Sequence, residues 1–331
     1  MDRCERMTTL FDRILEADVA IRPQVPVTPL DVSPVLSASL GCEVLLKCEH
    51  LQPTGSFKVR GAANKICCLD EAARAAGVIT ASTGNHGQGV ARAGALANVA
   101  VTVYVGTGTA SQKIAAIRAL GAEVIVIDGA PIDAELEARR QSELQGKTYI
   151  SPYNDLDVVA GQGTIGVELA RQAPELAAVF VAVGGGGLVS GIGTALKRLT
   201  PRARVVGVWP ENSPCMLKAL EAGAIVDTVE YPTLSDSTAG AVEAGSVTFP
   251  LCSAVIDESL TVTEAEIASA MRTIAQTDRW MIEGAAGVAV AGLLKSAHAW
   301  SGRKVAAIVC GRNIALDKFL HAVNGPLPAG A

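Results

Sequence analysis

The sequence lacks several features that define common classes of protein. None of its eight cysteines forms a Cys-x-x-Cys pair, which argues against a zinc knuckle or a disulfide framework and predicts a reduced, cytoplasmic protein. The 28 lysines and arginines form no basic block and are not interleaved with aromatic residues. The formal net charge is −5, so nucleic acid is not an expected partner.

Segments that would enter a membrane are also missing. Asp2, Arg3, Glu5 and Arg6 interrupt the N-terminus, which has no apolar stretch typical of a secretory signal. The longest uncharged run, residues 177–196, could span a bilayer by length, but it contains six glycines, four of them consecutive. Glycine is unfavourable in a lipid-facing helix, so we predict that the protein has no membrane partner.

The sequence does contain an alternation of short β-branched runs with longer Ala/Leu-rich segments. We expect strands at residues 43–46, 99–105, 122–127, 179–183, 205–208 and 305–309. We expect helices at residues 86–97, 111–120, 132–145, 162–172, 188–199, 214–221, 264–278 and 285–299. This alternation predicts an α/β fold with open, mostly parallel sheets flanked by helices. Ligands of such sheets bind beyond the carboxyl ends of the strands, so the loops there are the candidate site.

One lysine lies in a glycine-flanked polar break, Gly-Ser-Phe-Lys-Val-Arg-Gly at residues 55–61. A lysine amine is a covalent catalyst where it meets a carbonyl and loses its proton, and small residues let a flat ligand approach the backbone. Lys58 could instead be a solvated surface charge, as most lysines are. The motif alone does not decide between these interpretations.

Two later loops offer groups that bind anions. Residues 80–89 place Ser82, Thr83 and Asn85 before an alanine-rich helix, an arrangement that suits a carboxylate but also an ordinary helix cap. The four glycines at 184–187 follow an apolar strand and expose successive N–H groups, as a phosphate requires. A tightly packed crossover would need small residues there as well. The glycines match neither Gly-x-Gly-x-x-Gly nor a nucleotide P-loop.

A third strand runs into the turn Cys310-Gly311-Arg312-Asn313. Cys310 could be a buried apolar thiol, which is the usual role of a free cysteine. Taken with the lysine, the glycine loop and the Ser/Asn loop, however, a thiol at a strand end suggests one ligand, an aldehyde that carries a phosphate. That ligand is pyridoxal phosphate.

The chain resembles the fold type II pyridoxal-phosphate enzymes, specifically the serine/threonine dehydratase and serine racemase group, over residues 27–313. The resemblance rests on the order of four motifs: Ser-Phe-Lys-x-Arg-Gly-Ala, Ser-x-Gly-Asn-His, four glycines plus Leu, and Cys-Gly-x-Asn. It implies a two-domain α/β fold like that of the tryptophan synthase beta subunit. Residues 1–50 and 150–331 would form the large cofactor-binding domain, and residues 51–149 a small mobile domain.

The resemblance also implies a role for each matched residue. Lys58 would bind the cofactor aldehyde and move protons, Asn85 would bond the phenolic oxygen of the ring, and Cys310 would face the pyridine nitrogen. The implied cofactor-binding residues are Phe57, Lys58, Asn85, Gly184, Gly185, Gly186, Gly187, Leu188, Glu283 and Cys310. The implied substrate-binding residues are Ser82, Thr83, Asn85, His86 and Ser237, and the catalytic ones are Lys58 and Thr83.

The implied activity is dehydration of a 3-hydroxy amino acid to a 2-oxo acid and ammonia. Thr83 stands where racemases of the group carry a serine base, so an amino acid racemase is the alternative, and a non-catalytic pyridoxal-phosphate-binding protein is a third possibility. Members of the group are commonly dimers, so we expect a homodimer.

Several positions depart from the common pattern of the group. Trp209 and Cys215 replace acidic residues of a cation site, so we expect no metal. Ser237 and Arg312 replace glycines and would add polar bulk near the pocket. The surroundings resemble those of the hydroxyectoine-utilisation dehydratases, which favours a larger or more polar substrate of the 3-hydroxy-2,4-diaminobutyrate type.

Overall fold

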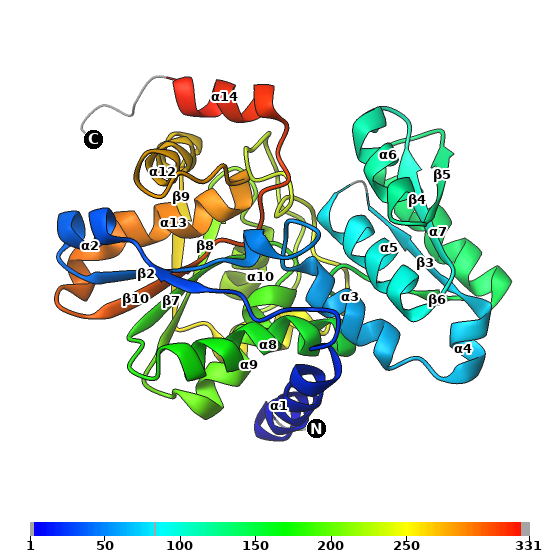
Figure 1. Ribbon diagram of the computed structural model, residues 1–331, viewed down its shortest axis with the longest axis horizontal. Helices are drawn as coiled ribbons and strands as arrows, with labels where there is room; N and C mark the ends of the chain where they lie inside the picture. The colour runs from blue at the N-terminus through cyan, green and yellow to red at the C-terminus, as the bar shows by residue number, and fades with distance from the viewer. Residues whose placement is uncertain (1–2, 83, 326–331) are drawn as a thin grey trace.

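The computed structural model describes residues 3–82 and 84–325, and the strands in them form two sheets (Figure 1). The larger sheet has the order β1-β2-β10-β7-β8-β9, and the smaller has the order β5-β4-β3-β6. All pairs are parallel except β1 with β2. The larger sheet comprises β1 (Leu30–Val32), β2 (Glu43–Lys47), β7 (Ala178–Ala182), β8 (Arg204–Pro210), β9 (Glu258–Val262) and β10 (Lys304–Ile308). The smaller comprises β3 (Val78–Ala81), β4 (Val101–Gly106), β5 (Glu123–Ile127) and β6 (Thr148–Tyr149).

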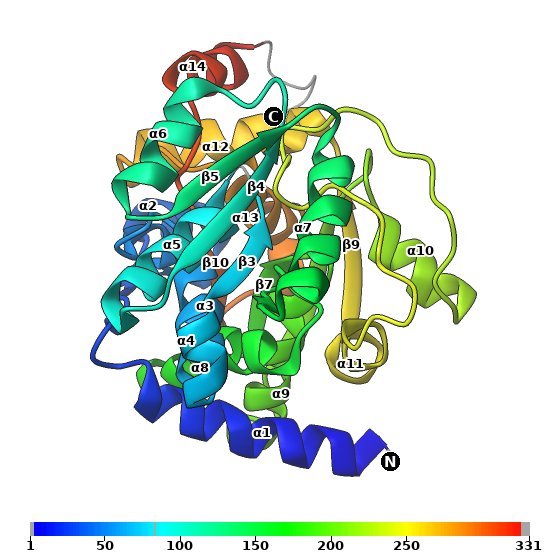
Figure 2. The same cartoon turned by 90° about the vertical axis from the view of Figure 1, so that its right-hand side faces the viewer.

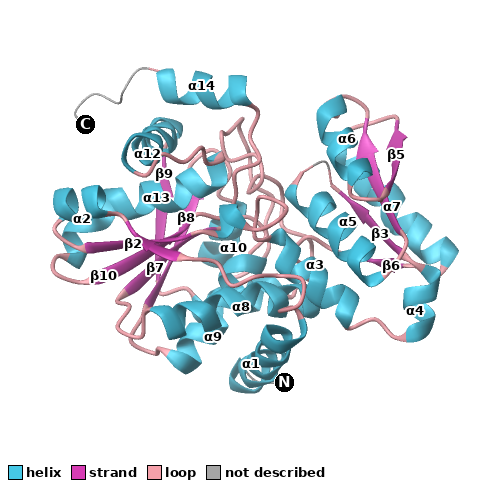
Figure 3. Ribbon diagram, in the orientation of Figure 1, coloured by secondary structure: helices cyan, strands magenta, loops and turns pink. Residues whose placement is uncertain are grey.

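Helices pack on both faces of each sheet (Figure 3). Around the larger sheet lie α1 (Arg3–Ala20), α2 (Pro34–Leu40), η1 (Glu49–Leu51), α8 (Leu156–Gln172), α9 (Gly187–Leu199), α10 (Cys215–Ala222), α11 (Thr248–Val255), α12 (Glu264–Thr277), α13 (Gly284–Ser296), η2 (Ala297–Trp300) and α14 (Leu316–Asn324). Around the smaller sheet lie α4 (Glu71–Ala76), α5 (Asn85–Ala97), α6 (Ser111–Ala119) and α7 (Pro131–Gln145). Helix α3 (Lys58–Cys67) packs against both α5 and α8 and so joins the two bodies (Figure 2).

The predicted fold class is confirmed, and the predicted strands are all present within two residues of their expected ends. The sequence analysis did not predict β1, β3, β6 or β9, which are short or half-exposed. The periodicity also did not predict that the strands divide into two sheets. It also did not predict α1, α2, α3, α4, α11 or α14. None of the helices in the described residues is long and apolar enough to cross a membrane.

Helix α8 begins at Leu156, six residues before the predicted start at 162. Asp155 caps it by accepting hydrogen bonds from the amides of Asp157 and Val158. A Cβ on Gly161 would lie 2.5 Å from the carbonyl oxygen of Arg60 on α3, and a Cβ on Gly166 would lie 2.7 Å from that of Ile192 on α9. The glycines, which weakened the helical pattern in the sequence, therefore serve close helix packing.

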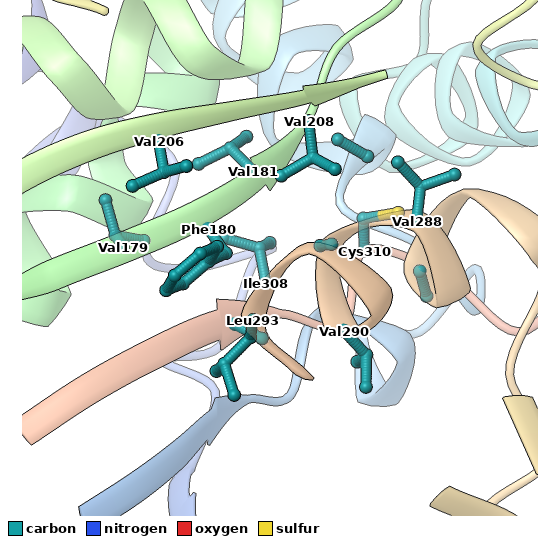
Figure 4. Packing of buried hydrophobic residues seen from close by; sticks show 14 of the residues in the cluster. Val179, Phe180, Val181, Val206, Val208, Val288, Val290, Leu293, Ile308 and Cys310 are labelled. Carbon is teal, nitrogen blue, oxygen red and sulfur yellow. The ribbon is translucent and has the colours of Figure 1, made fainter. Parts of the chain in front are cut away.

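The core of the larger sheet is mostly aliphatic and includes residues of β7, β8, β10 and the helix α13 that packs on them (Figure 4). Phe180 and Val181 on β7 and Ile308 on β10 are 0% exposed. This core continues to Cys310, which lies beside Val288 of α13 (Figure 4). Apolar packing thus reaches directly to the edge of the sheet where the predicted site lies.

A second buried cluster is ionic and lies between α3, β2 and α8. The guanidinium of Arg60, 0% exposed, donates at 2.7 and 2.8 Å to Glu49 and at 2.7 and 2.9 Å to Glu168. Lys47, also fully buried, donates to Glu168 at 2.6 Å. Burial opposes ionisation of Glu168, but the charges and hydrogen bonds of Arg60 and Lys47 outweigh it and lower the pKa of that carboxyl to about 2. The cluster therefore fixes the position of α3 through buried, hydrogen-bonded ion pairs.

We expect Arg60→Leu to reduce the free energy of unfolding by about 3–5 kcal/mol, because it leaves the buried carboxylate of Glu49 without its ion-pair partner and removes one of the cations that pair with Glu168. Urea denaturation followed by circular dichroism measures this. Arg204→Ala, which removes an exposed ion pair with Glu258, is the control and should cost less than about 1 kcal/mol. Equal effects of the two substitutions would contradict the role assigned to Arg60.

Candidate active site

The loops that follow β3, β6, β7 and β10 meet, together with the end of β4, at a cavity of about 720 Å³ between the two sheets. Both bodies line it, the smaller through Ser82, Asn85 and Glu135 and the larger through the glycine loop (residues 184–187) and Cys310. Its size is typical of a site for a small molecule. The predicted loops are therefore brought together at the carboxyl ends of the strands.

Lys58 is held beside Cys310 by backbone pairing of two distant segments. Ser56 forms a bridge with Gly311, the amide of Phe57 donates to the carbonyl of Cys310 at 3.1 Å, and the amide of Arg312 donates to the carbonyl of Gly55 at 2.9 Å. Gly55 adopts φ +74°, which glycine permits and other residues rarely do. Helix α3 begins immediately afterwards, at Lys58.

The amine of Lys58 points into the cavity and donates to the carbonyl oxygen of Pro152 at 2.8 Å. Burial lowers the pKa of Lys58 to about 8, although Cys310 and Glu283 act in the opposite direction. Nζ also lies 5.3 Å from the centre of the Phe57 ring. A surface charge is excluded, and the amine titrates in the range that a nucleophile requires.

The glycine loop lies between β7 and the start of α9 and lines the cavity. A Cβ on Gly185 would lie 2.5 Å from the ring of Tyr153, and one on Gly184 would lie 2.8 Å from the carbonyl oxygen of Thr238. Gly186, at φ +86°, is packed against Cys252. The amides of Gly184, Gly185 and Gly187 donate no hydrogen bond to any described residue. The glycines of the loop are needed for packing, and its free amides suit a phosphate.

Cys310 contributes a neutral thiol to the cavity. Its side chain is 3% exposed, and burial raises the pKa of the thiol well above its usual range, with Glu283 acting in the same direction. Such a thiol presents a weak hydrogen-bonding group and no formal charge.

Asn85 belongs to a hydrogen-bonded chain that crosses between the two bodies. Its side-chain NH2 donates to the carboxylate oxygens of Glu283 at 2.9 and 3.0 Å, and its carbonyl accepts from Asn313 at 2.6 Å. The Ser237 hydroxyl makes a long contact of 3.5 Å with Glu283. Burial raises the pKa of Glu283, against the hydrogen bond from Asn85. Glu283 and Asn313 therefore already orient the Asn85 side-chain amide. The expected bond to a cofactor oxygen would use the hydrogen-bonding capacity that this amide has left.

The expected carboxylate loop is described only in part. Ser82 lines the cavity and accepts a hydrogen bond from the amide of Gly84 at 3.2 Å, whereas Thr83 lies outside the described residues. The imidazole of His86 donates through Nε2 to the carbonyl oxygen of Ile150 at 3.0 Å, and burial with the nearby Lys58 charge lowers its pKa to about 3. His86 is therefore neutral and has no second N–H, so its backbone amide at the start of α5 suits an anion better than its ring.

A group of ionisable residues crosses between the bodies on the side of the cavity formed by α7. Arg139 of α7 bonds Glu135 at 2.8 Å and forms an ion pair with Glu243 at 2.9 Å. Both glutamates line the cavity, and the amide of Glu243 donates to the Tyr153 hydroxyl at 2.9 Å. Among the described residues that line the cavity, Lys58 is the only lysine or arginine.

Comparison with known proteins agrees with this geometry. Residues 21–311 match the family described as "Pyridoxal-phosphate dependent enzyme". The chain is 41% identical to an L-threonine ammonia-lyase of Thermotoga maritima, over 96% of this chain and 79% of that protein. Its fold matches the processed form of threonine deaminase isoform 2 of Solanum lycopersicum, with a TM-score of 0.92, 34% identity and coverage of 97% and 93%. It also matches serine racemase of Dictyostelium discoideum, with a TM-score of 0.85, 34% identity and coverage of 92% and 99%.

The chain therefore belongs to the pyridoxal-phosphate dependent enzymes of fold type II. Within them it is a lyase of the serine/threonine dehydratase and serine racemase group, and its cofactor is pyridoxal phosphate. The residues present fit this group, since one cavity combines a half-buried amine for the aldehyde, free amides for the phosphate and a neutral thiol. In the described part of the chain, no three His, Cys, Asp or Glu side chains are grouped so as to hold a metal ion.

The sequence analysis missed Pro152, Tyr153, Glu135 and Glu243 as residues of the cavity. The run Ser-Pro-Tyr-Asn-Asp at 151–155 carries a turn signal that could have drawn attention to the first two. The glutamates carried no signal, because nothing in their spacing connects α7 with a loop about a hundred residues later. Arg312 was wrongly expected near the pocket: its side chain is exposed and does not line the cavity.

The lowered pKa of Lys58 predicts how covalent capture of pyridoxal phosphate depends on pH. Only the neutral amine attacks an aldehyde, so the capture rate should rise with pH, about ten-fold per unit below pH 8, and level off above it. Stopped-flow absorbance of the cofactor-free chain measures this rate. Lys58→Ala should give no capture, whereas the exposed Lys218→Ala should behave as wild type. A profile still rising at pH 10 would contradict the lowered pKa.

Proposed function

We propose that this enzyme removes water from a 3-hydroxy amino acid to give a 2-oxo acid and ammonia. The observation that carries the proposal is the pairing of a half-buried amine with a lowered pKa, Lys58, with an uncharged thiol, Cys310, in one cavity. Bound pyridoxal phosphate supplies an electron sink for the pair released when the Cα–H bond of the substrate breaks. A neutral thiol near the ring nitrogen leaves that sink weaker than a carboxylate would. Early loss of a β-hydroxyl is then favoured over long-lived carbanion chemistry.

In this proposal each group of the chain has a separate task. The glycine loop and the Leu188 amide bind the phosphate, Phe57 flanks the ring, and the amides at the start of α5 bind the substrate carboxylate. Lys58 takes the Cα proton. The Cα–H and Cβ–O bonds break, water leaves, and the resulting enamine hydrolyses to the 2-oxo acid and ammonia.

We further propose that the substrate carries a second amino group, as 3-hydroxy-2,4-diaminobutyrate derived from hydroxyectoine does. Two carboxylates, Glu135 and Glu243, line the cavity and share a single cation, Arg139. An ammonium group on the substrate would balance the remaining negative charge, whereas a second substrate carboxylate would find no free cation among the described lining residues. Ser237, in the same lining segment as Glu243, adds a hydroxyl to the cavity.

A substrate panel tests this function. Purified holoenzyme is incubated with L-threonine, L-serine, L-threo-3-hydroxyaspartate and 3-hydroxy-2,4-diaminobutyrate, and 2-oxo acid, ammonia and D-amino acid are measured. We expect 2-oxo acid and ammonia in equal amounts, with the highest kcat/KM for the diamino compound. D-amino acid without 2-oxo acid would replace the proposal by a racemase, and an enzyme that binds the cofactor but forms no product would replace it by a binding protein.

Removing one carboxylate should affect the diamino substrate selectively. We expect Glu135→Gln to raise its KM about ten-fold and to leave the KM for L-threonine within about two-fold, because a charge-assisted bond is lost only in the first case. Glu137→Gln, two residues away and paired with Arg140 on the exposed face of α7, is the matched control. Equal changes for both substrates would show that Glu135 does not recognise the second amine.

Three further predictions from the sequence accompany this proposal. Residues 51–149 act as a small mobile domain, the enzyme is a homodimer, and it works in the cytoplasm. The two-sheet arrangement and the hydrogen-bonded chain from Asn85 to Glu283 support a site that changes when the bodies move relative to one another. Light scattering of the purified protein measures the subunit number.

A further inference from the structure

The turn at residues 151–154, between β6 and α8, is the partner of the Lys58 amine. Each of its residues has a hydrogen bond that fixes it. The Ser151 hydroxyl accepts from the amides of Tyr153 and Asn154 at 3.4 and 3.0 Å. Asn154 donates to Glu243 at 2.8 Å and accepts from the Val247 amide at 2.9 Å. Hydrogen bonds therefore hold the turn both within itself and to residues 243–247, of which Glu243 lines the cavity.

The direction of the Pro152 carbonyl follows from the Ser151 contact. The Pro152 carbonyl and the Tyr153 N–H belong to one planar trans peptide unit, so they point in opposite directions. The N–H is directed at the Ser151 hydroxyl, and the carbonyl is accordingly directed at Nζ of Lys58, 2.8 Å away. Ser151 is 4% exposed and does not line the cavity, so it acts on the lysine only through this peptide.

We infer that the Pro152 carbonyl is the acceptor that orients the free Lys58 amine during turnover, and that Ser151 and Asn154 are positioning residues for it. A neutral amine has one lone pair and two hydrogens. When one hydrogen is donated to Pro152, rotation about the Cε–Nζ bond is restricted and the lone pair is held in a narrow range of directions in the cavity. The same carbonyl stabilises the ammonium formed when the amine takes a proton, because an N–H remains available for it.

The contacts of Tyr153 connect this orientation with the phosphate site. Its ring lies against Gly185, and a Cβ on Gly187 would lie 3.1 Å from the Tyr153 Cβ. One turn thus sets the position of the amine relative to the glycine loop. The part of the inference that concerns removal of the Cα proton rests on the proposed function. The part that concerns capture of the cofactor aldehyde by the Lys58 amine does not.

The test compares two ligands of the cofactor-free chain, pyridoxal phosphate and its alcohol analogue, pyridoxine phosphate. Both carry the phosphate and the ring, but only the aldehyde reacts with the amine. We expect Ser151→Ala to slow capture of pyridoxal phosphate about ten-fold and to leave the Kd of pyridoxine phosphate within about two-fold. In the holoenzyme, kcat should fall to a similar extent while KM stays within about two-fold.

Three variants serve as controls. Ser151→Thr keeps the acceptor oxygen and should restore capture. Asn154→Ala removes the bonds from the same turn to Glu243 and Val247 and should also slow capture. This variant tests the inference if Ser151→Ala does not fold. Ser37→Ala removes a serine that also accepts a backbone amide, from Val44 at 2.9 Å, but lies remote from the cavity, and it should match wild type in capture.

Two results would overturn the inference: capture by both Ser151→Ala and Asn154→Ala at the wild-type rate, or an equal loss of affinity for pyridoxine phosphate, which would assign the turn to the phosphate site alone. The capture experiment uses no amino acid, so its outcome is independent of the proposed dehydration. That proposal fails separately, if the wild-type holoenzyme forms no 2-oxo acid from any substrate of the panel.

Discussion

The active site depends on one buried guanidinium. Arg60 lies two residues after Lys58 on α3, and it is enclosed by carboxylates from two other elements, Glu49 beyond β2 and Glu168 on α8. A buried charge of this kind cannot leave its partners without a large desolvation penalty, so it fixes the rotation and the height of the first turn of α3. The position of the Lys58 amine is therefore set by an ionic cluster whose residues do not line the cavity.

Around the cavity the opposite principle applies, because burial suppresses charge. Burial lowers the pKa values of Lys58 and His86 and raises those of Glu283 and Cys310, so each of these groups is moved toward its neutral form. Of the four, Lys58 and Cys310 line the cavity itself. In the proposed function, the phosphate and the substrate carboxylate would be bound by backbone amides and helix ends instead of by cations.

Local sequence was sufficient to predict β2, β4, β5, β7, β8 and β10, which appear in the sequence as short β-branched runs, but not the four shorter or half-exposed strands. The loops at the site could be recognised because they carry rare residue types. The motifs at Lys58, Asn85, the glycine loop and Cys310 are accordingly found in one cavity. The local sequence around Pro152 signals a turn but not that its backbone carbonyl reaches the site, and Glu135, on the surface of α7, carries no local signal at all. Arg312 is the opposite case, in which the position in the sequence was misleading. It lies next to Asn313, but its side chain does not reach the pocket.

The position of β10 in the larger sheet has a consequence for how the chain folds. This strand, almost the last element of the fold, is inserted between β2 and β7, and the residues just after it pair with Gly55 and Phe57. Until it arrives, β2 and β7 each present an unpaired edge, and the segment before Lys58 lacks its backbone pairing with residues 310–312. Contacts across about 250 residues close slowly, and exposed strand edges invite association between chains in the meantime. On the ribosome, the growing chain must therefore wait for its final strand before it can hold its cofactor, a period in which protection by chaperones would matter most.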